Sequence, residues 1–348
     1  MLFEGIEICC PRCRDELERP AENVLVCRGC QRRFPMVLGI PDLRVAPDPY
    51  IGFEAERAKV DKLVQRFDDY DLEGFIDFYY ANTSVVPPQH AALYKRSLLA
   101  GVARARGWLD AWEMASGTGM RMNVAESALL EVGCGTAPLL VAAERYVPRV
   151  GVDIALRWLL VGKKRLQQAG LDIPLLCACA EALPFRPSTF DYAVADSALE
   201  HFTDQHQALD EMLRAMKPGA RLFIATPNRF SIGPDPQTGI WAGSLLPESW
   251  TAAIVRRQGG IPPIRRLLSA GQLSRLLSEA GFLGIKVYLP PISAEQRAHF
   301  PAPVRAAIAL YDAARQLPIL RELLRLFGPL LHAVGQRLAP GGVAALKR

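Results

Sequence analysis

The alternation of short apolar runs with helical patterns that begins at residue 128 constrains the fold of this chain more than any other feature. Residues 128–132 form an apolar run that ends at the turn GCGT, residues 133–136. Residues 138–146 then have helical spacing, and residues 150–153 form a second short strand that ends on an acid. Because strands that alternate with helices form parallel sheets, this pattern predicts an α/β domain.

The glycine turn has the properties of a ligand-binding loop. Gly133 and Gly135 let the backbone approach a ligand closely, and Asp153 stands at the end of the next strand, where it can accept hydrogen bonds from ribose hydroxyls. Dinucleotide-binding folds use a third glycine beside the pyrophosphate, whereas Ala137 and Pro138 occupy that region here. We therefore expect a nucleoside-type cofactor without phosphates.

The order of the motifs between residues 129 and 289 resembles that of class I S-adenosylmethionine-dependent methyltransferases. The run EVGCGT at residues 131–136 resembles the first motif of that family. It is followed by Asp153, by AEALPF at 180–185, by FDYAV at 190–194, by LEH at 199–201 and by MKPGA at 216–220. The resemblance implies an α/β fold with a Rossmann-like seven-stranded sheet, helices on both faces and S-adenosyl-L-methionine as cofactor. It assigns cofactor binding to Glu131, Gly133, Cys134, Gly135, Asp153, Ile154, Ala180, Glu181 and Asp196.

The resemblance also implies where a catalytic base would stand. Ligands bind at the carboxyl ends of the strands, and Glu200 and His201 follow the strand expected at residues 192–196. His201, with Glu200 beside it, is the candidate base; the alternative is that His201 caps or packs the next helix. One position departs from the family pattern, because Cys179 replaces the aspartate that commonly receives the adenine amino group. Glu181 or backbone carbonyls would then make this contact.

Two Cys-x-x-Cys pairs near the N-terminus predict a metal site. Cys10 and Cys13, followed by Cys27 and Cys30, can each hold one side of a tetrahedral Zn²⁺ ion. Cys9 also falls within ligand spacing of Cys13, but the proline that follows Cys10 favours Cys10. The segment resembles small zinc-ribbon proteins that activate tRNA and protein methyltransferases, and we expect a scaffold that docks on the large domain. Five arginines would offset the charge of four thiolates or, alternatively, contact RNA: Arg12, Arg14, Arg28, Arg32 and Arg33.

These patterns divide the chain into five segments. We expect a zinc ribbon at 1–48, a helical lid or N-terminal extension at 49–127, the cofactor-binding core at 128–290, an amphipathic helical insertion at 291–341 and the final strand of the core at 342–348, antiparallel between the fifth and sixth strands. Residues 317–338 carry an apolar stripe opposite Arg321 and Arg325, which is typical of a helix packed on the domain or, alternatively, of peripheral membrane contact. The loop at 228–268 is expected to shape a substrate pocket.

Charge and composition narrow the function classes. The formal net charge is +5, and residues 291–348 alone hold eight Lys and Arg against three Asp and Glu, so the rest of the chain is neutral. A neutral body argues against a broad nucleic-acid surface. Glu4 and Glu7 stand where a signal peptide would be apolar, and no uncharged apolar run has the length of a membrane span, so we expect a cytoplasmic protein.

Three functions remain open at this point. The leading hypothesis is an enzyme that methylates a small or lipid-linked metabolite, by resemblance to ubiquinone and natural-product methyltransferases. The first alternative is an rRNA or tRNA methyltransferase with a zinc ribbon. The second is a non-catalytic binding partner with the same fold, which the intact Gly133, Gly135 and Asp153 oppose.

Overall fold

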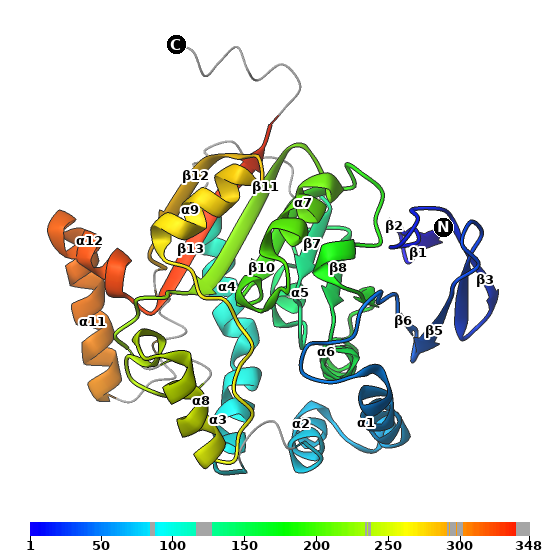
Figure 1. Cartoon of the computed structure of the whole chain (residues 1–348), viewed down its shortest axis with the longest axis horizontal. Helices are drawn as coiled ribbons and strands as arrows, with labels where there is room; N and C mark the ends of the chain where they lie inside the picture. Colours follow the sequence, from blue (N-terminus) through cyan, green and yellow to red (C-terminus); the bar gives the residue numbers. More distant parts are fainter. Residues whose placement is uncertain are drawn as a thin grey trace.

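A seven-stranded sheet forms the centre of the molecule (Figure 1). The computed structural model describes residues 1–83, 88–115, 127–233, 235, 238–290, 292, 297 and 302–338. In chain order the strands are β7 (Leu129–Val132), β8 (Arg149–Asp153), β9 (Leu175–Cys177), β10 (Phe190–Asp196), β11 (Met216–Pro227), β12 (Phe282–Tyr288) and β13 (Leu330–Arg337). They are arranged in the order β12-β13-β11-β10-β7-β8-β9, with β13 antiparallel to both of its neighbours. The prediction of a seven-stranded Rossmann-like sheet is confirmed.

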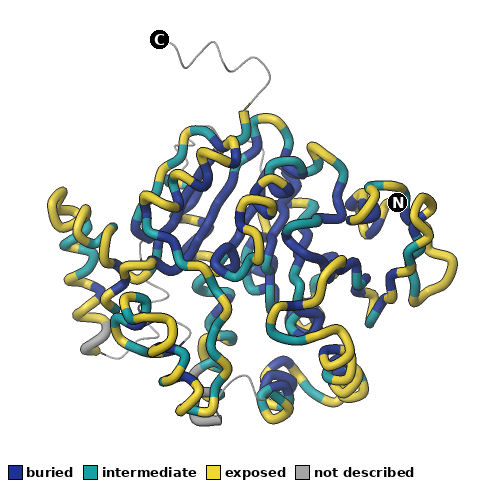
Figure 2. Tube along the Cα trace, viewed as in Figure 1, coloured by how far each residue is buried: buried dark blue, intermediate teal, exposed yellow. Residues whose placement is uncertain are grey.

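Helices cover both faces of this sheet, because the side chains of each buried strand point alternately to opposite sides. Leu129 packs into the apolar cluster that contains α4 (Gly101–Ala115), α5 (Pro138–Ala142) and α6 (Leu156–Gln168). Leu130 packs into the other cluster, which contains α7 (Gln205–Ala215) and α9 (Ala270–Glu279). Figure 2 shows the strands as the most buried part of the trace. The carboxyl ends of the strands are left as the accessible edge.

The strand between β11 and β12 is formed by other residues than expected. Leu330–Arg337 pairs with β11 through Val334 opposite Phe223 and with β12 through Ala333 opposite Val287. The prediction of one helix over 317–338 is therefore wrong in its second half, since α12 (Pro318–Phe327) ends before Gly328. Five consecutive residues of β13, 331–335, are buried, so the strand does not show the burial alternation of a half-exposed strand. Residues 342–348, where this strand was expected, lie outside the described residues.

The N-terminal module is a small antiparallel sheet that shares a core with the large domain. Its strands are β3 (Leu17–Ala21), β4 (Val24–Cys27), β5 (Arg33–Val37) and β6 (Ile40–Pro41), preceded by the pair β1 (Leu2–Phe3) and β2 (Ile6–Glu7). Ile8 and Leu25 belong to the same apolar cluster as Leu183 and Phe185 of the large domain. Arg14 forms an ion pair of 2.6 Å with Glu211 on α7. The module is thus docked on the large domain, as the sequence led us to expect.

The segment between the module and the sheet is helical in the described residues. It contains α1 (Phe53–Gln65), α2 (Leu72–Ala81), α3 (Pro88–Leu99) and α4. Beyond β11 lie α8 (Glu248–Arg257) and, after β12, α11 (Ala302–Gln316) and α12 (Figure 1). None of the helices in the described ranges has the length and apolar character needed to cross a membrane.

Candidate active site

A cavity of about 750 Å³ opens at the carboxyl ends of β7, β8 and β10. All the residues that the sequence assigned to cofactor binding or catalysis line it: Glu131, Gly133, Cys134, Gly135, Asp153, Ile154, Ala180, Glu181, Asp196, Glu200 and His201. They come from five separate segments of the chain. A crevice outside the carboxyl ends of parallel strands is the usual ligand site of open α/β sheets.

The turn after β7 passes so close to Ala198 that position 133 has no space for a side chain. Gly133 has a φ of +80°, and a Cβ built on it would lie 2.2 Å from the Cβ of Ala198. Gly135 also has a positive φ, and its N–H donates a hydrogen bond of 2.8 Å to Oδ2 of Asp153. A side chain at position 133 would force the loop away from Ala198. The two glycines therefore fix the shape of the cavity floor.

Two carboxyl groups, those of Asp153 and Glu131, line the cavity beside this turn. Asp153 accepts the N–H of Gly135 at Oδ2 and the N–H of Ala155 at Oδ1, also at 2.8 Å, and each oxygen keeps a second lone pair. Burial raises the pKa of Asp153. Glu131 is 2% exposed, and its Oε2 has no hydrogen-bond partner among the described residues. Burial, and then the neighbouring Asp196, raise the pKa of Glu131 well above its ordinary value. A buried, unpartnered carboxyl oxygen on a cavity wall fits a cationic group of a ligand.

The expected adenine end of the cavity contains no aspartate. The thiol of Cys179 is turned away from the cavity and contacts the carbonyl of Ala46 at 3.6 Å. Ala180 and Glu181 remain on the cavity wall, and Oε1 of Glu181 accepts the N–H of Asp204 at 3.1 Å. The carboxylate of Glu181 is thus partly engaged, although its second oxygen can still accept a bond.

Glu200 and His201 lie on the short helix η4 (Leu199–His201) directly after β10, where a base was expected. Nδ1 of His201 lies 3.0 Å from the carbonyl oxygen of Ile264. A carbonyl only accepts, so Nδ1 carries the proton and Nε2 is the basic nitrogen. Burial lowers the pKa of His201, which keeps the ring neutral near pH 7.

Glu200 is buried beside this histidine. Its Oε1 lies 4.0 Å from Nε2 of His201 and has no hydrogen-bond partner among the described residues, while Oε2 accepts from the hydroxyl of Thr226 at 3.0 Å. Burial raises the pKa of Glu200 to about 7. Burial likewise raises the pKa of Asp196, at the end of β10, to about 7. Groups with such pKa values exchange protons readily at neutral pH.

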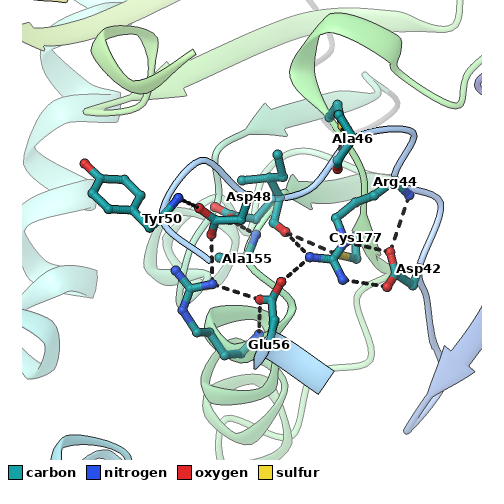
Figure 3. A network of polar contacts seen from close by, with 12 residues as sticks. Asp42, Arg44, Ala46, Asp48, Tyr50, Glu56, Ala155 and Cys177 are labelled. Atoms are coloured by element: carbon teal, nitrogen blue, oxygen red, sulfur yellow. Dashed lines mark hydrogen bonds and ion pairs between the residues drawn. The ribbon is translucent and has the colours of Figure 1, made fainter. Parts of the chain in front are cut away.

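The sequence did not indicate that the connector between the N-terminal module and α1 forms part of the cavity. Asp48 and Tyr50 both line it. Figure 3 shows the polar network that holds this connector in place. Arg157 donates hydrogen bonds of 2.8 Å to Asp48 and to Glu56, which is fully buried in α1. Asp48 is thus held in place on the cavity wall.

Arg44 completes the network on its other side. It donates to both oxygens of Asp42, at 2.8 and 2.6 Å, contacts the second oxygen of Glu56, and donates to the carbonyl of Ile154 at 3.2 Å. Ile154 directly follows Asp153. The one signal in the sequence was a charge on an apolar helix stripe, because Glu56 shares its face of α1 with the buried Val60 and Leu63.

The rest of the cavity wall is aromatic and aliphatic. Tyr79 and Tyr80 from α2 and Trp158 from α6 stand together, with ring centroids of Tyr79 and Trp158 4.4 Å apart. Val255 and Ile261 come from the 228–268 loop, which reaches the cavity as expected. The cavity therefore has acidic side chains at the strand ends and an apolar wall of aromatic and aliphatic side chains.

The two cysteine pairs meet in the N-terminal module. The Sγ atoms of Cys10, Cys13, Cys27 and Cys30 all lie within 4.8 Å of one another, with Cys10 and Cys30 3.7 Å apart and Cys13 and Cys27 3.3 Å apart. Four sulfurs around Zn²⁺ at ~2.3 Å would be ~3.8 Å apart, so the cluster fits a tetrahedral zinc site. The two turns are alike, because Arg14 and Gln31 both have a positive φ and donate to the carbonyls of Cys10 and Cys27.

The fifth cysteine and two of the arginines near the four-cysteine cluster contact other parts of the protein. Cys9 is buried outside it, and its N–H donates to the carbonyl of Pro184. Of the neighbouring arginines, Arg14 pairs with Glu211, and Arg28 pairs with Glu16 at 2.8 Å and with Glu18. These two guanidinium groups serve contacts within the protein.

The fold and the crevice together define an α/β protein with a cavity at the carboxyl ends of its parallel strands. Residues 130–224 match the family model described as "Methyltransferase domain". The ubiquinone/menaquinone biosynthesis C-methyltransferase of Laribacter hongkongensis is 36% identical over 100 residues, which are 28% of this chain and 41% of that protein. The ubiquinone biosynthesis O-methyltransferase of Idiomarina loihiensis is 35% identical over 103 residues, 29% of this chain and 42% of that protein.

Residues 130–224 are thus similar to a methyltransferase domain, and the chain spans less than half the length of the curated relatives it matches. Among solved structures, it is similar to a methyltransferase from Thermotoga maritima described as a possible histamine N-methyltransferase. That similarity has a TM-score of 0.44 and 17% identity, and it covers 72% of this chain and 96% of the other.

Proposed function

We propose that this protein transfers a methyl group from S-adenosyl-L-methionine to a small, largely apolar or lipid-linked metabolite. The observation that carries the proposal is the crevice in which the turn at Gly133 and Gly135 faces the carboxyl groups of Asp153 and Glu131. The matched methyltransferase domain, residues 130–224, contains all four residues.

The residues of the crevice fit this cofactor part by part. Asp153 has lone pairs left for two ribose hydroxyls, and the unpartnered oxygen of Glu131 suits the ammonium of an amino acid. Ile154 and Ala180 offer backbone and apolar surface for the base. Bound there, the cofactor supplies a methyl group that its sulfonium has already activated.

The chain's own residues then have to orient an acceptor and remove its proton. The apolar wall holds the acceptor and excludes water, and such alignment accounts for several kcal/mol of a barrier. Nε2 of His201 is unprotonated and can take a proton from the acceptor, and Oε1 of Glu200 lies 4.0 Å from the same nitrogen. General base catalysis by such a group contributes about 10²- to 10⁴-fold. His201 is the proposed catalytic residue, with Glu200 as its proton partner.

Two observations support a small acceptor over RNA. The cavity wall contains aromatic and aliphatic side chains such as Tyr80, Trp158 and Val255, which suit an apolar acceptor. In the N-terminal module, Arg14 and Arg28 are engaged in ion pairs within the protein. Two of the relatives are named as methyltransferases of ubiquinone or menaquinone biosynthesis. An rRNA or tRNA substrate is the alternative, and copurified RNA whose binding falls steeply with salt would favour it.

Calorimetric titration of the purified protein with S-adenosyl-L-methionine tests the proposal. We expect one site per chain and an affinity that falls at least tenfold in Asp153→Asn, because the amide loses charge and one acceptor oxygen. Asp172→Asn, an exposed aspartate, is the matched control. Absence of binding, or equal affinity in the two variants, would contradict the proposed site. Incubation with labelled cofactor and host extract then separates an enzyme from a non-catalytic binding partner.

We further propose that α12 touches a membrane surface from which a lipid-linked acceptor is taken. Every residue of α12 is at least partly exposed; Ile319 is 78% and Leu323 47% exposed, while Arg321 and Arg325 stand on the other side. Residues 330–337 take no part in this contact, since they form β13. We expect sedimentation with anionic phosphatidylglycerol vesicles, lost in Ile319→Ser/Leu323→Ser and retained in Leu2→Ser, an exposed leucine of the N-terminal module. Equal retention of both variants would refute this contact.

A further inference from the structure

Tyr50 joins the N-terminal module to the loop that closes over the cavity. It lies on the connector between β6 and α1, and its ring points away from the buried network in Figure 3. Its hydroxyl oxygen accepts the N–H of Ile264 at 2.7 Å and donates to the carbonyl of the same residue at 3.1 Å. Two hydrogen bonds to one peptide residue fix that residue in both position and orientation.

The position of Tyr50 is itself fixed from behind. Its N–H donates to Oδ1 of Asp48 at 2.8 Å, and Oδ2 of Asp48 accepts from Arg157 at 2.8 Å. Both Asp48 and Arg157 are buried, and Arg157 is held in turn by Glu56. Burial raises the pKa of Tyr50, so its hydroxyl stays protonated and able to donate.

The carbonyl that Tyr50 holds is the one that faces His201. Ile264 O lies 3.0 Å from Nδ1 of His201, and the hydroxyl oxygen of Tyr50 lies 3.5 Å from the same nitrogen. The charged groups that act on this ring are Arg265, Asp153 and Asp48, together with Glu200 at 4.0 Å from Nε2. Two groups lie near Nδ1, the Tyr50 hydroxyl and the Ile264 carbonyl, and the carbonyl can only accept a hydrogen bond. The position of this carbonyl therefore decides which ring nitrogen of His201 carries the proton.

We propose that Tyr50 is a positioning residue that holds the Ile264 carbonyl against Nδ1 of His201 and thereby keeps Nε2 as the unprotonated, basic nitrogen. The connector of the N-terminal module thus prepares the proposed base without touching the substrate's reacting atom. This inference rests on the proposed function only for its catalytic consequence. The state of the imidazole can be observed without any methyl donor.

Nitrogen-15 NMR of histidine-labelled protein tests the inference directly. In the wild-type protein we expect His201 to be a single tautomer with Nδ1 protonated, its signal assigned by its loss in His201→Gln. In Tyr50→Phe the hydroxyl is missing, so the His201 signals should move toward the average of the two tautomers, a change of about tenfold in their ratio. Tyr70→Phe removes a hydroxyl that accepts a hydrogen bond from Arg66 at 3.1 Å, and it should leave His201 unchanged.

Turnover provides the second measurement. With an acceptor in hand, Tyr50→Phe should lower kcat about tenfold and change the KM for S-adenosyl-L-methionine less than twofold. A purely structural role for Tyr50 would lower the melting temperature and leave the tautomer unchanged. An Nε2-protonated ring in the wild-type protein, or an unchanged His201 spectrum in Tyr50→Phe, would overturn the inference. If S-adenosyl-L-methionine does not bind at all, the proposed function fails, while the NMR result still decides this point.

Discussion

Replacing Glu56 by glutamine should weaken the whole protein although the new side chain has the same shape. Glu56 is fully buried and lies between two arginines, with one oxygen on Arg44 and the other 2.8 Å from Arg157. An amide keeps one acceptor oxygen for one arginine and turns an NH₂ donor toward the other. The network then contains a contact between two donors in place of an ion pair.

The expected cost is about 3 kcal/mol of unfolding free energy. A hydrogen bond to a charged group contributes about 1.5–3 kcal/mol, and breaking a buried ion pair costs about 3–5 kcal/mol. We take the lower end of the ion-pair range because each arginine retains another ion pair in the variant, Arg44 with Asp42 and Arg157 with Asp48. For a domain of this size ~3 kcal/mol corresponds to roughly 6–12 °C in the melting temperature.

Thermal and urea unfolding with excess zinc measure this difference. Glu54→Gln is the matched control, because Glu54 lies in the same first turn of α1 and is exposed. It should cost less than about 1 kcal/mol, the usual contribution of an acid at a helix N-terminus. If both variants lose the same amount, or if Glu56→Gln is as stable as the wild type, the network does not stabilise the fold in the way described.

Two further predictions concern the zinc cluster and Glu200. Metal analysis should find one zinc per chain in the wild type and in Cys9→Ser, and a loss of zinc in Cys13→Ser; zinc retained by Cys13→Ser would exclude the four-cysteine site. Glu200 has a pKa of about 7 in the folded protein, above its ordinary 4.5, because burial favours the protonated form. Its contribution to the free energy of unfolding is therefore fully present below pH 4.5 and is lost as the pH rises through 7. Raising the pH from 4.5 to 8 should therefore stabilise Glu200→Gln relative to the wild type by about 3 kcal/mol in urea titrations, whereas parallel curves would contradict the burial of this charge.

Much of the sheet could be predicted because its determinants are local. The turn at Gly133 and Gly135 follows a short apolar strand, and Asp153 closes the next strand, so position along the chain sufficed to place them at one edge. The cysteine pairs could be grouped for the same reason, since each pair sits in its own tight turn. The proline after Cys10 favoured Cys10 over Cys9 as the fourth ligand, and in the structure Cys9 forms a β-bridge with Glu16.

The features that escaped prediction depend on contacts between distant segments. Leu330–Arg337 shares helical spacing with α12, and only its pairing with β11 and β12 makes it a strand. Asp48 and Tyr50 lie in a segment without periodicity, and their role comes from Arg157 and Ile264, more than a hundred residues away. A connector of this kind has no sequence pattern of its own to detect.

The common core of the N-terminal module and the sheet has a practical consequence for anyone wishing to produce the large domain alone. A shortened protein starting near residue 49 would lose Ile8 and Leu25 and expose Leu183 and Phe185 to solvent. Such an exposed apolar surface favours aggregation. It would also discard Arg44 and leave Glu56 with a single cationic neighbour. The N-terminal module thus stabilises the large domain, so tags or fusions should be placed elsewhere.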